Sequence, residues 1–147
     1  MKKATHFLAI IMMLATVTAL FCGCNHTLPS NYAHPNKGQP IASVELLNNS
    51  SWQYTGQEFE VVKVLDHAEI PAFMEKLYDL PTQKSITPPA RDFGPNIVRV
   101  IYENGDMELF GSWHIEYIKS GEEISGVGSY SFADERFDEL FNAYIAG

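Results

Sequence analysis

Cysteine is almost absent from this chain of 147 residues, and its two copies, Cys22 and Cys24, both lie near the start. No cysteine follows Cys24, so any domain beyond it lacks the disulfide scaffold that stabilises many small secreted domains. The same absence excludes a Cys-x-x-Cys redox or zinc motif and a cysteine nucleophile in that part of the chain. Such a domain must be stable through its hydrophobic core alone.

Positive charge is also scarce, with 10 Lys and Arg residues against 18 Asp and Glu residues and a formal net charge of −8. Two of the ten, Lys2 and Lys3, precede Cys24; without them the chain has eight basic residues and a formal charge of −10. Nucleic acids and anionic lipid headgroups are bound through clustered Lys and Arg. We therefore expect no nucleic-acid partner and no adhesion to a membrane through a basic surface.

Recognisable catalytic motifs are missing as well. The chain has no Gly-x-Ser-x-Gly, no His-Glu-x-x-His, no phosphate-binding loop and no dinucleotide-binding glycine run. His114 and Glu116 would point to one side of a strand, but two such residues are at most half of a metal site. We therefore assign no catalytic residue, no metal and no cofactor. A cell-surface hydrolase or transferase without a recognisable motif remains the alternative function.

The first 23 residues are organised like an export signal. Lys2 and Lys3 precede an uncharged, mostly apolar stretch, residues 7–22, which is short for a membrane-spanning helix. Phe21-Cys22-Gly23-Cys24 resembles the lipobox of bacterial lipoproteins, whose cysteine receives fatty acyl chains such as palmitate and becomes the first residue. The resemblance implies an extracytoplasmic protein held on the outer face of the cell membrane through Cys24. Ordinary cleavage after Ala19, or an uncleaved anchor, remains possible at this point.

Residues 25–40 are expected to form a flexible tether. They contain three prolines, one glycine, several amides and no acidic residue, a composition that cannot bury a core face. The 107 residues from Ile41 to Gly147 are enough for one core and too few for two domains. The expected organisation is a signal peptide over 1–23, a lipidated cysteine and tether over 24–40, and a single domain over 41–147.

The hydrophobic periodicity of this domain predicts an α+β fold. Strand-like alternation covers residues 41–47, 58–65, 114–119 and 124–130, and amphipathic helices are expected to begin near Asp66 and near Ser131. The element order is ββα-βββα. Short links favour an antiparallel sheet of about five strands, with the two helices packed on one face of it.

The dipeptide Asn104-Gly105, between two apolar runs, predicts a hairpin with a two-residue type I′ turn. That turn would set Val100 opposite Leu109, with Leu109 on the core face and Glu108 on the other. The second face would then combine apolar side chains with charged ones, namely Ile97, Ile101 and Phe110 with Arg99, Glu103 and Glu108.

The leader, the hairpin sequence IYENGDMEL and the closing helical sequence FDELFNAYI together resemble small uncharacterised lipoproteins of Gram-positive bacteria. The resemblance covers most of the chain after Cys24 and rests on patterning, without a catalytic motif. It implies a cell-surface lipoprotein and transfers no functional residue to this chain.

These observations favour a non-enzymatic, lipid-anchored domain that binds a protein, a peptide or an envelope polymer near the membrane. The membrane itself would be a partner through the lipid. The candidate contact residues lie in three places: the second hairpin face (Ile97, Arg99, Ile101, Phe110), a polar loop (Trp52, Tyr54) and a proline-rich connection (Arg91, Phe93). Alternatively, Trp113 or the connection over 81–95 covers the hairpin face and forms a second small core there.

Overall fold

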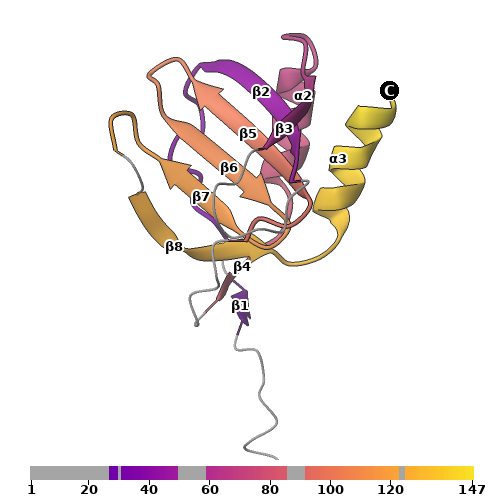
Figure 1. Ribbon diagram of the computed structural model, residues 1–147. Helices are drawn as coiled ribbons and strands as arrows, with labels where there is room; N and C mark the ends of the chain where they lie inside the picture. The colour runs from indigo at the N-terminus through magenta and orange to yellow at the C-terminus, as the bar shows by residue number, and fades with distance from the viewer. Residues whose placement is uncertain (1–26, 30, 50–58, 86–91, 123–124) are drawn as a thin grey trace, which may run out of the picture.

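The structure is a computed structural model that describes residues 27–29, 31–49, 59–85, 92–122 and 125–147; for residues 27–29, 85 and 125–129 it describes the backbone only. The described chain is α+β, with one antiparallel sheet and two helices, which confirms the predicted class (Figure 1). The elements in chain order are β1 (Thr27–Pro29), β2 (Ile41–Asn48), β3 (Glu60–Val64), α2 (Ile70–Tyr78), β4 (Thr82–Ser85), β5 (Asn96–Tyr102), β6 (Met107–Gly111), β7 (Ile115–Ile118), β8 (Ser125–Phe132) and α3 (Arg136–Ala146).

The sheet has eight strands in the order β1-β4-β8-β7-β6-β5-β2-β3, so the prediction of about five strands is wrong. Two short strands account for much of the difference, because β1 and β4 lie in segments that we expected to be a tether and a loop. Their sequences, Thr-Leu-Pro and Thr-Gln-Lys-Ser, have no apolar alternation that would predict a strand. In the folded chain the two segments pair in antiparallel fashion, with Leu28 opposite Lys84.

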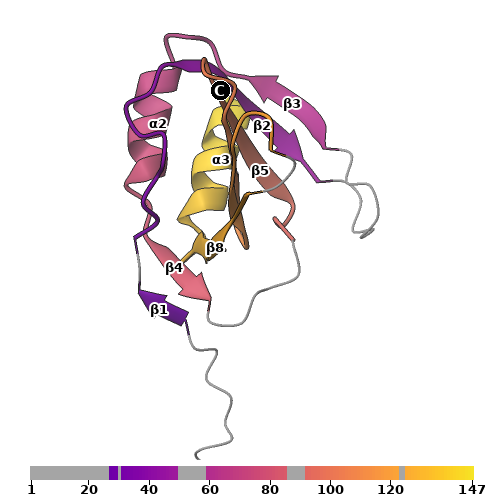
Figure 2. The ribbon, with the colours of Figure 1, turned by 90° about the vertical axis from the view of Figure 1, so that its left-hand side faces the viewer.

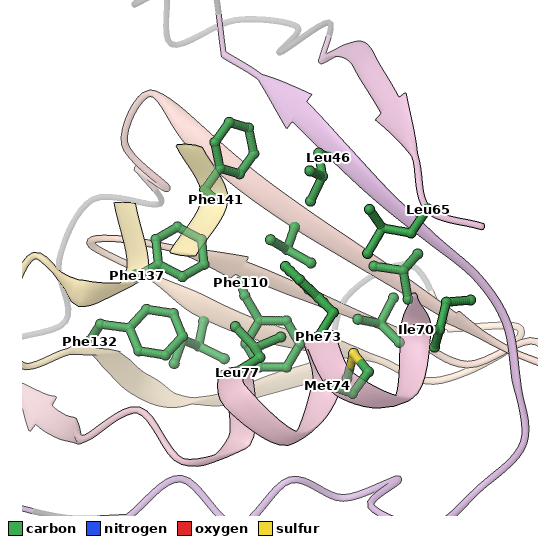
Figure 3. Packing of buried hydrophobic residues seen from close by; sticks show 14 of the residues in the cluster. Leu46, Leu65, Ile70, Phe73, Met74, Leu77, Phe110, Phe132, Phe137 and Phe141 are labelled. Carbon is green, nitrogen blue, oxygen red and sulfur yellow. The ribbon is translucent and has the colours of Figure 1, made fainter. Parts of the chain in front are cut away.

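The main hydrophobic cluster combines sheet and helix side chains. On β5, Val98 and Val100 enter this cluster, whereas Ile97 points to the opposite face. Both helices contribute their apolar stripes, and Figure 3 shows Phe73 and Leu77 of α2 close to Phe110 of β6 in this cluster. The helix residues buried there are Ile70, Phe73, Met74 and Leu77 from α2, and Phe137 and Phe141 from α3.

The turn between β5 and β6 is longer than the predicted type I′ turn. Tyr102 N–H donates to the Asp106 carbonyl at 3.0 Å, and Gly105 N–H donates to the Tyr102 carbonyl at 2.9 Å, so three residues form the loop. Gly105 has a φ of 86°, and no described residue other than glycine has a positive φ. A type I′ turn needs positive φ at both central residues, so Asn104 cannot occupy one.

Contacts of Asp106 explain the longer turn. Its carboxylate accepts hydrogen bonds from the Tyr117 hydroxyl and the Ser120 N–H, both at 2.9 Å. Its own N–H donates to the Asn104 side-chain oxygen at 2.9 Å. These bonds hold Asp106 in the loop, and two of its partners lie more than ten residues further along the chain.

The longer loop shifts the β5–β6 register by one residue. Val100 lies opposite Glu108, and Val98 lies opposite Phe110. Because side chains alternate between the two faces of a strand, a shift of one residue moves every β6 side chain to the other face. Glu108 and Phe110 are therefore fully buried on the side of the main cluster, while Leu109 joins the cluster on the opposite face. The predicted faces of β6 are wrong.

Part of the predicted tether belongs to the folded domain. Besides the β1–β4 pairing, the side chain of Tyr32 is 4% exposed and lies in the main cluster. The Tyr32 N–H donates to the Thr82 hydroxyl at 2.7 Å, which joins this segment to the start of β4. Residues 25–40 cannot build a core face of their own, but one aromatic side chain can fill a core that other elements provide. The folded part of the chain thus begins before Ile41.

Candidate functional site

The predicted apolar contact patch on the β5–β6 hairpin is not formed. Phe110 is 0% exposed within the main cluster, and Ile97 is 0% exposed in a smaller cluster on the opposite face. Phe93, from the proline-rich connection, is 1% exposed and covers Ile97 and Leu109 in that smaller cluster. A Cβ atom at Gly111 would lie 2.1 Å from the Phe93 carbonyl oxygen, so this connection passes directly over β6. The connection therefore covers the hairpin face and forms a second small core there, which was the alternative expectation.

Of the other predicted contact residues, the structure describes Arg99 and Ile101. Arg99 is half-buried, and its Nε donates to Oε2 of Glu45 at 2.6 Å across the β2–β5 pair. Ile101 is half-buried on β5. Trp52, Tyr54 and Arg91 lie outside the described residues.

A carboxyl group buried in the core is the first part of a different candidate site. Glu108 is 0% exposed and lies on β6 beside the main hydrophobic cluster. The hydroxyl of Tyr102, which is 1% exposed, donates a hydrogen bond to Glu108 Oε2. The hydroxyl of Tyr78 lies 3.0 Å from the hydroxyl of Tyr102. A polar chain thus runs from Glu108 through Tyr102 to Tyr78 at the end of α2.

Tyr32 and His34 complete this group from the N-terminal segment. The ring of His34 lies 4.2 Å from the ring of Tyr78 and 4.9 Å from that of Tyr32, measured between centroids. Tyr32 also packs edge-on against Tyr130, at 5.3 Å. His34 Nδ1 is buried and has no hydrogen-bond partner among the described residues, and the buried Tyr32 hydroxyl lies close enough to Glu108 for the carboxyl group to act on its pKa. Buried polar atoms without partners are uncommon and deserve a functional explanation.

Burial controls the protonation of these groups. It raises the pKa of Glu108, against the opposing effect of the hydrogen bond from Tyr102. It raises the pKa values of Tyr32 and Tyr102, and the negative charge of Glu108 adds to both shifts. Burial, with a smaller contribution from the positive charge of Lys37, lowers the pKa of His34 to about 4. At neutral pH, His34 is therefore an uncharged imidazole that can donate one hydrogen bond and accept another.

A pocket of about 650 Å³ opens beside this group, between the N-terminal segment and the junction of α2 with β4. The ammonium group of Lys37 lies 5.4 Å from the ring centroid of Tyr78, and Asp79 contributes a carboxylate of opposite sign. The lining residues are Asn31, Tyr32, Ala33, His34, Lys37, Tyr78, Asp79, Leu80, Pro81 and Thr82. Chemically, the pocket offers hydrogen-bonding groups of both kinds and nearly balanced charge.

The sequence interpretation missed this site for two reasons. It placed Glu108 on the outer face because of the register error, and it placed Tyr32 and His34 in a flexible tether. One feature could have indicated otherwise: Tyr32 is the only Phe, Trp or Tyr between residues 25 and 40. A single large aromatic residue in a polar segment is a candidate for burial in a neighbouring core.

The described residues offer neither a metal site nor a membrane-spanning helix. Among the residues that the structure describes, no three His, Cys, Asp or Glu side chains are grouped so that they could hold a metal ion. In the same part of the chain, neither helix has the length and apolar character needed to cross a membrane. Comparison of the chain with protein-family models, curated protein sequences and solved structures gave no match.

Proposed function

We propose that this chain is a lipid-anchored extracytoplasmic domain that binds a polar ligand, a peptide or a segment of an envelope polymer, in the pocket beside His34. The observation that carries the proposal is the convergence of this pocket with side chains of perturbed pKa, Tyr32, His34 and Tyr78. Such convergence is typical of ligand-binding sites in proteins.

The lining indicates the chemistry of the ligand. Lys37 and Asp79 supply one charge of each sign, and His34 is neutral at pH 7 because its pKa is lowered to about 4. A ligand with a large net charge would leave one of these groups uncompensated. A neutral or zwitterionic ligand with several hydrogen-bonding groups therefore fits best.

Anchoring at Cys24 would hold the pocket close to the membrane. Only Asn25 and His26 separate Cys24 from the first residue of β1, Thr27. An extended chain spans at most roughly 3.3–3.6 Å per residue, so Thr27 would lie no more than about 10 Å from the lipidated residue. The pocket begins at Asn31, four residues further on. Because this connection is short, we expect the ligand to be one that is present at the membrane surface.

The alternative function, a hydrolase or transferase, gains no support from the pocket. The Thr82 hydroxyl in its lining accepts a hydrogen bond from the Tyr32 N–H and so holds the N-terminal segment in place. Glu108 is not part of the lining and is fully buried. We therefore retain the non-enzymatic binding domain as the proposal.

Processing at Cys24 is the first testable part of the proposal. Mass spectrometry of the membrane fraction should find a lipid-bearing peptide that begins at Cys24, because Gly23 provides the small side chain that the peptidase needs before its cut. The variant Cys24→Ser should lose both the lipid and the membrane association. A soluble product that begins at Leu20 would contradict lipid anchoring.

Ligand binding at the pocket is tested by a matched pair of lysine variants. Lys37 lies 5.4 Å from the ring centroid of Tyr78 in the pocket, and Lys76 lies 5.5 Å from that of Tyr144 outside it, so the same local contact is lost in both. We expect Lys37→Ala to weaken binding about tenfold or more, the size of one lost charge-assisted hydrogen bond, and Lys76→Ala to leave binding unchanged.

The measurement is calorimetric titration of the processed protein, in detergent, with a panel of short peptides and envelope oligosaccharides. The ring protons of His34 should shift in NMR spectra when a panel member binds, since His34 lines the pocket. If no member of the panel binds, or if both lysine variants weaken binding equally, the pocket is not the ligand site.

A further inference from the structure

The hydroxyl groups of Tyr78 and Tyr102 join the pocket beside His34 to the buried carboxyl group of Glu108. Figure 2 shows the N-terminal segment, which forms one wall of the pocket, running beside α2, whose last residue is Tyr78. Tyr78 is partly exposed and lines the pocket, whereas Tyr102 and Glu108 are 1% and 0% exposed. Of these three residues, Tyr78 is therefore the one that a ligand can touch.

The order of donors and acceptors along this chain of hydrogen bonds is fixed when Glu108 is ionised. A carboxylate has no proton, so it can only accept the hydrogen bond from the Tyr102 hydroxyl. A tyrosine hydroxyl has a single proton, and Tyr102 uses its own in the bond to Glu108. In the contact of 3.0 Å between the two hydroxyl oxygens, Tyr78 is therefore the donor. The Tyr78 hydroxyl then has no proton left for a ligand and can only accept a hydrogen bond from one.

Protonation of Glu108 removes this constraint. A neutral carboxylic acid can donate a hydrogen bond as well as accept one. When Glu108 donates to Tyr102, the Tyr102 proton becomes free for Tyr78, and the Tyr78 proton becomes free for a ligand. The protonation state of a group that no ligand reaches thus decides which hydrogen-bonding role Tyr78 offers to the pocket.

The groups around Glu108 keep their own protonation states near neutral pH. Three tyrosines face it from neighbouring elements, namely Tyr102 on β5, Tyr117 on β7 and Tyr32 in the N-terminal segment. Burial raises the pKa values of all three, so they keep their protons. Asp106, which accepts the Tyr117 hydroxyl, stays ionised, because a hydrogen bond from a backbone N–H and others from side chains lower its pKa.

On the pocket side, Tyr78 is faced by His34 and Lys37. The His34 ring lies 4.2 Å from the Tyr78 ring, and the Lys37 ammonium group lies 5.4 Å from it. His34 is uncharged near neutral pH because burial lowers its pKa to about 4. Glu108, whose pKa is raised by burial, is therefore the member of this network whose charge changes as the pH rises above about 5.

We propose that Glu108 is a positioning residue for the pocket: through Tyr102 it fixes the Tyr78 hydroxyl as an acceptor, so that the pocket selects ligands that donate a hydrogen bond there. This inference rests on the proposed function and deepens it by naming the chemistry of the ligand. Peptide N–H groups and sugar hydroxyls are such donors, whereas tertiary amides and ethers have no proton to donate. Protonation of Glu108 relaxes the selection.

The coupling between Glu108 and Tyr78 is tested without a ligand. NMR spectra of the processed protein in detergent follow the carboxyl carbon of Glu108 and the Cζ atom of Tyr78, which responds to hydrogen bonding of its hydroxyl, between about pH 5 and 9. We expect the two resonances to change with the same midpoint. In Glu108→Gln, which cannot titrate, the change at Tyr78 should be lost.

A matched pair of variants separates the chain of hydrogen bonds from the direct effect of the Glu108 charge on Tyr78. Tyr102→Phe removes the hydroxyl between them, so Glu108 should still titrate while the change at Tyr78 falls by about half or more. Tyr117→Phe removes a hydroxyl that bonds to Asp106 instead, and should leave the change at Tyr78 in place. A full response of Tyr78 in Tyr102→Phe, or a Tyr78 resonance that does not follow Glu108 in the wild type, would overturn the proposal.

Two small amides test the selection itself. N-methylacetamide has one N–H donor, and N,N-dimethylacetamide has the same carbonyl group and no donor. Above the midpoint of Glu108, the first should bind about threefold or more tightly than the second, the size of one hydrogen bond, as measured by the shifts of the Tyr78 and His34 resonances. Tyr102→Phe leaves the Tyr78 proton free for a ligand, so this preference should be lost.

The outcomes separate this inference from the proposed function. Equal binding of the two amides to the wild type would overturn the selection by Glu108 and leave the pocket as a ligand site. If neither amide shifts the pocket resonances, the proposed function fails and the selection fails with it.

Discussion

Phe110→Asp is expected to leave the domain unfolded at room temperature. Phe110 is 0% exposed, and its ring lies 6.3 Å from those of Tyr32 and Phe132 in the main cluster. Loss of a buried phenylalanine costs about 3–5 kcal/mol, and burial of a carboxylate without a partner adds several more. Domains of this size are stable by roughly 5–15 kcal/mol, so the variant would retain little or no stability.

The matched control is Val64→Asp, which introduces the same carboxylate at a position that is 54% exposed. Its free energy of unfolding should fall by no more than about 1–1.5 kcal/mol, because Asp is a poor strand residue and lies opposite Glu45 of β2. Denaturant titration followed by circular dichroism measures both variants. A stable Phe110→Asp variant would mean that Phe110 faces outward, as the type I′ register predicts, and that the shifted register is wrong.

Glu108→Ala is expected to lower the free energy of unfolding by about 2–4 kcal/mol. The change leaves a cavity where a fully buried side chain was, and it removes the acceptor of the Tyr102 hydroxyl in the core. The exposed Glu103 in the neighbouring turn provides the control, since Glu103→Ala should cost less than about 0.5 kcal/mol. Equal midpoints of the two variants in urea would show that Glu108 is not in the core.

The same residue makes a prediction about pH. The pKa of Glu108 is raised in the folded state, mainly by burial, so the folded state keeps its proton to higher pH than the unfolded state does. The stability contributed by Glu108 is therefore fully present below the unfolded pKa, about 4.3, and is lost as pH rises through the folded pKa. Glu108→Gln keeps an acceptor for Tyr102 but cannot titrate, so it should remove this loss.

The pKa of His34 is shifted in the opposite direction, and its effect on stability falls in an overlapping range of pH. Its folded pKa is lowered to about 4, so the stability that it contributes is present above the unfolded pKa of about 6.5 and is lost as pH falls. The informative measurement is thus the difference in unfolding free energy between Glu108→Gln and wild type, followed from pH 4 upward, because the contribution of His34 cancels. A difference that does not change with pH would contradict the raised pKa of Glu108.

The two helices could be predicted from the sequence because their information is local. Residues at helical spacing, such as Phe73 and Leu77 in α2 and Phe137 and Phe141 in α3, are buried as the apolar stripes predict. Both starts were predicted too early: α2 begins at Ile70, after a turn that starts at Asp66, and α3 begins at Arg136, because Ser131 and Phe132 belong to β8. The Asp66 N–H donates to the Glu69 carboxylate at 3.1 Å, a bond that closes the turn before α2.

The candidate site could not be predicted, because each of its parts depends on contacts between distant segments. Tyr32 is buried by elements that lie far along the chain, and its N–H bonds to Thr82, 50 residues away. Glu108 is buried only because the β5–β6 register is shifted. A sequence pattern reports the neighbours of a residue in the chain, whereas burial depends on its neighbours in space.

Composition and periodicity were enough to establish the α+β fold class, the acidic charge, the lack of a disulfide framework beyond Cys24 and the apolar stripes of the helices. The turn at Asn104-Gly105 and the pairing of β1 with β4 depend on contacts that exist only in the folded chain. The dipeptide is compatible with more than one turn, and bonds from Tyr117 and Ser120 to Asp106 select the longer one. Strand pairing across more than 50 residues has no local pattern, because its energy comes from backbone groups that every residue carries.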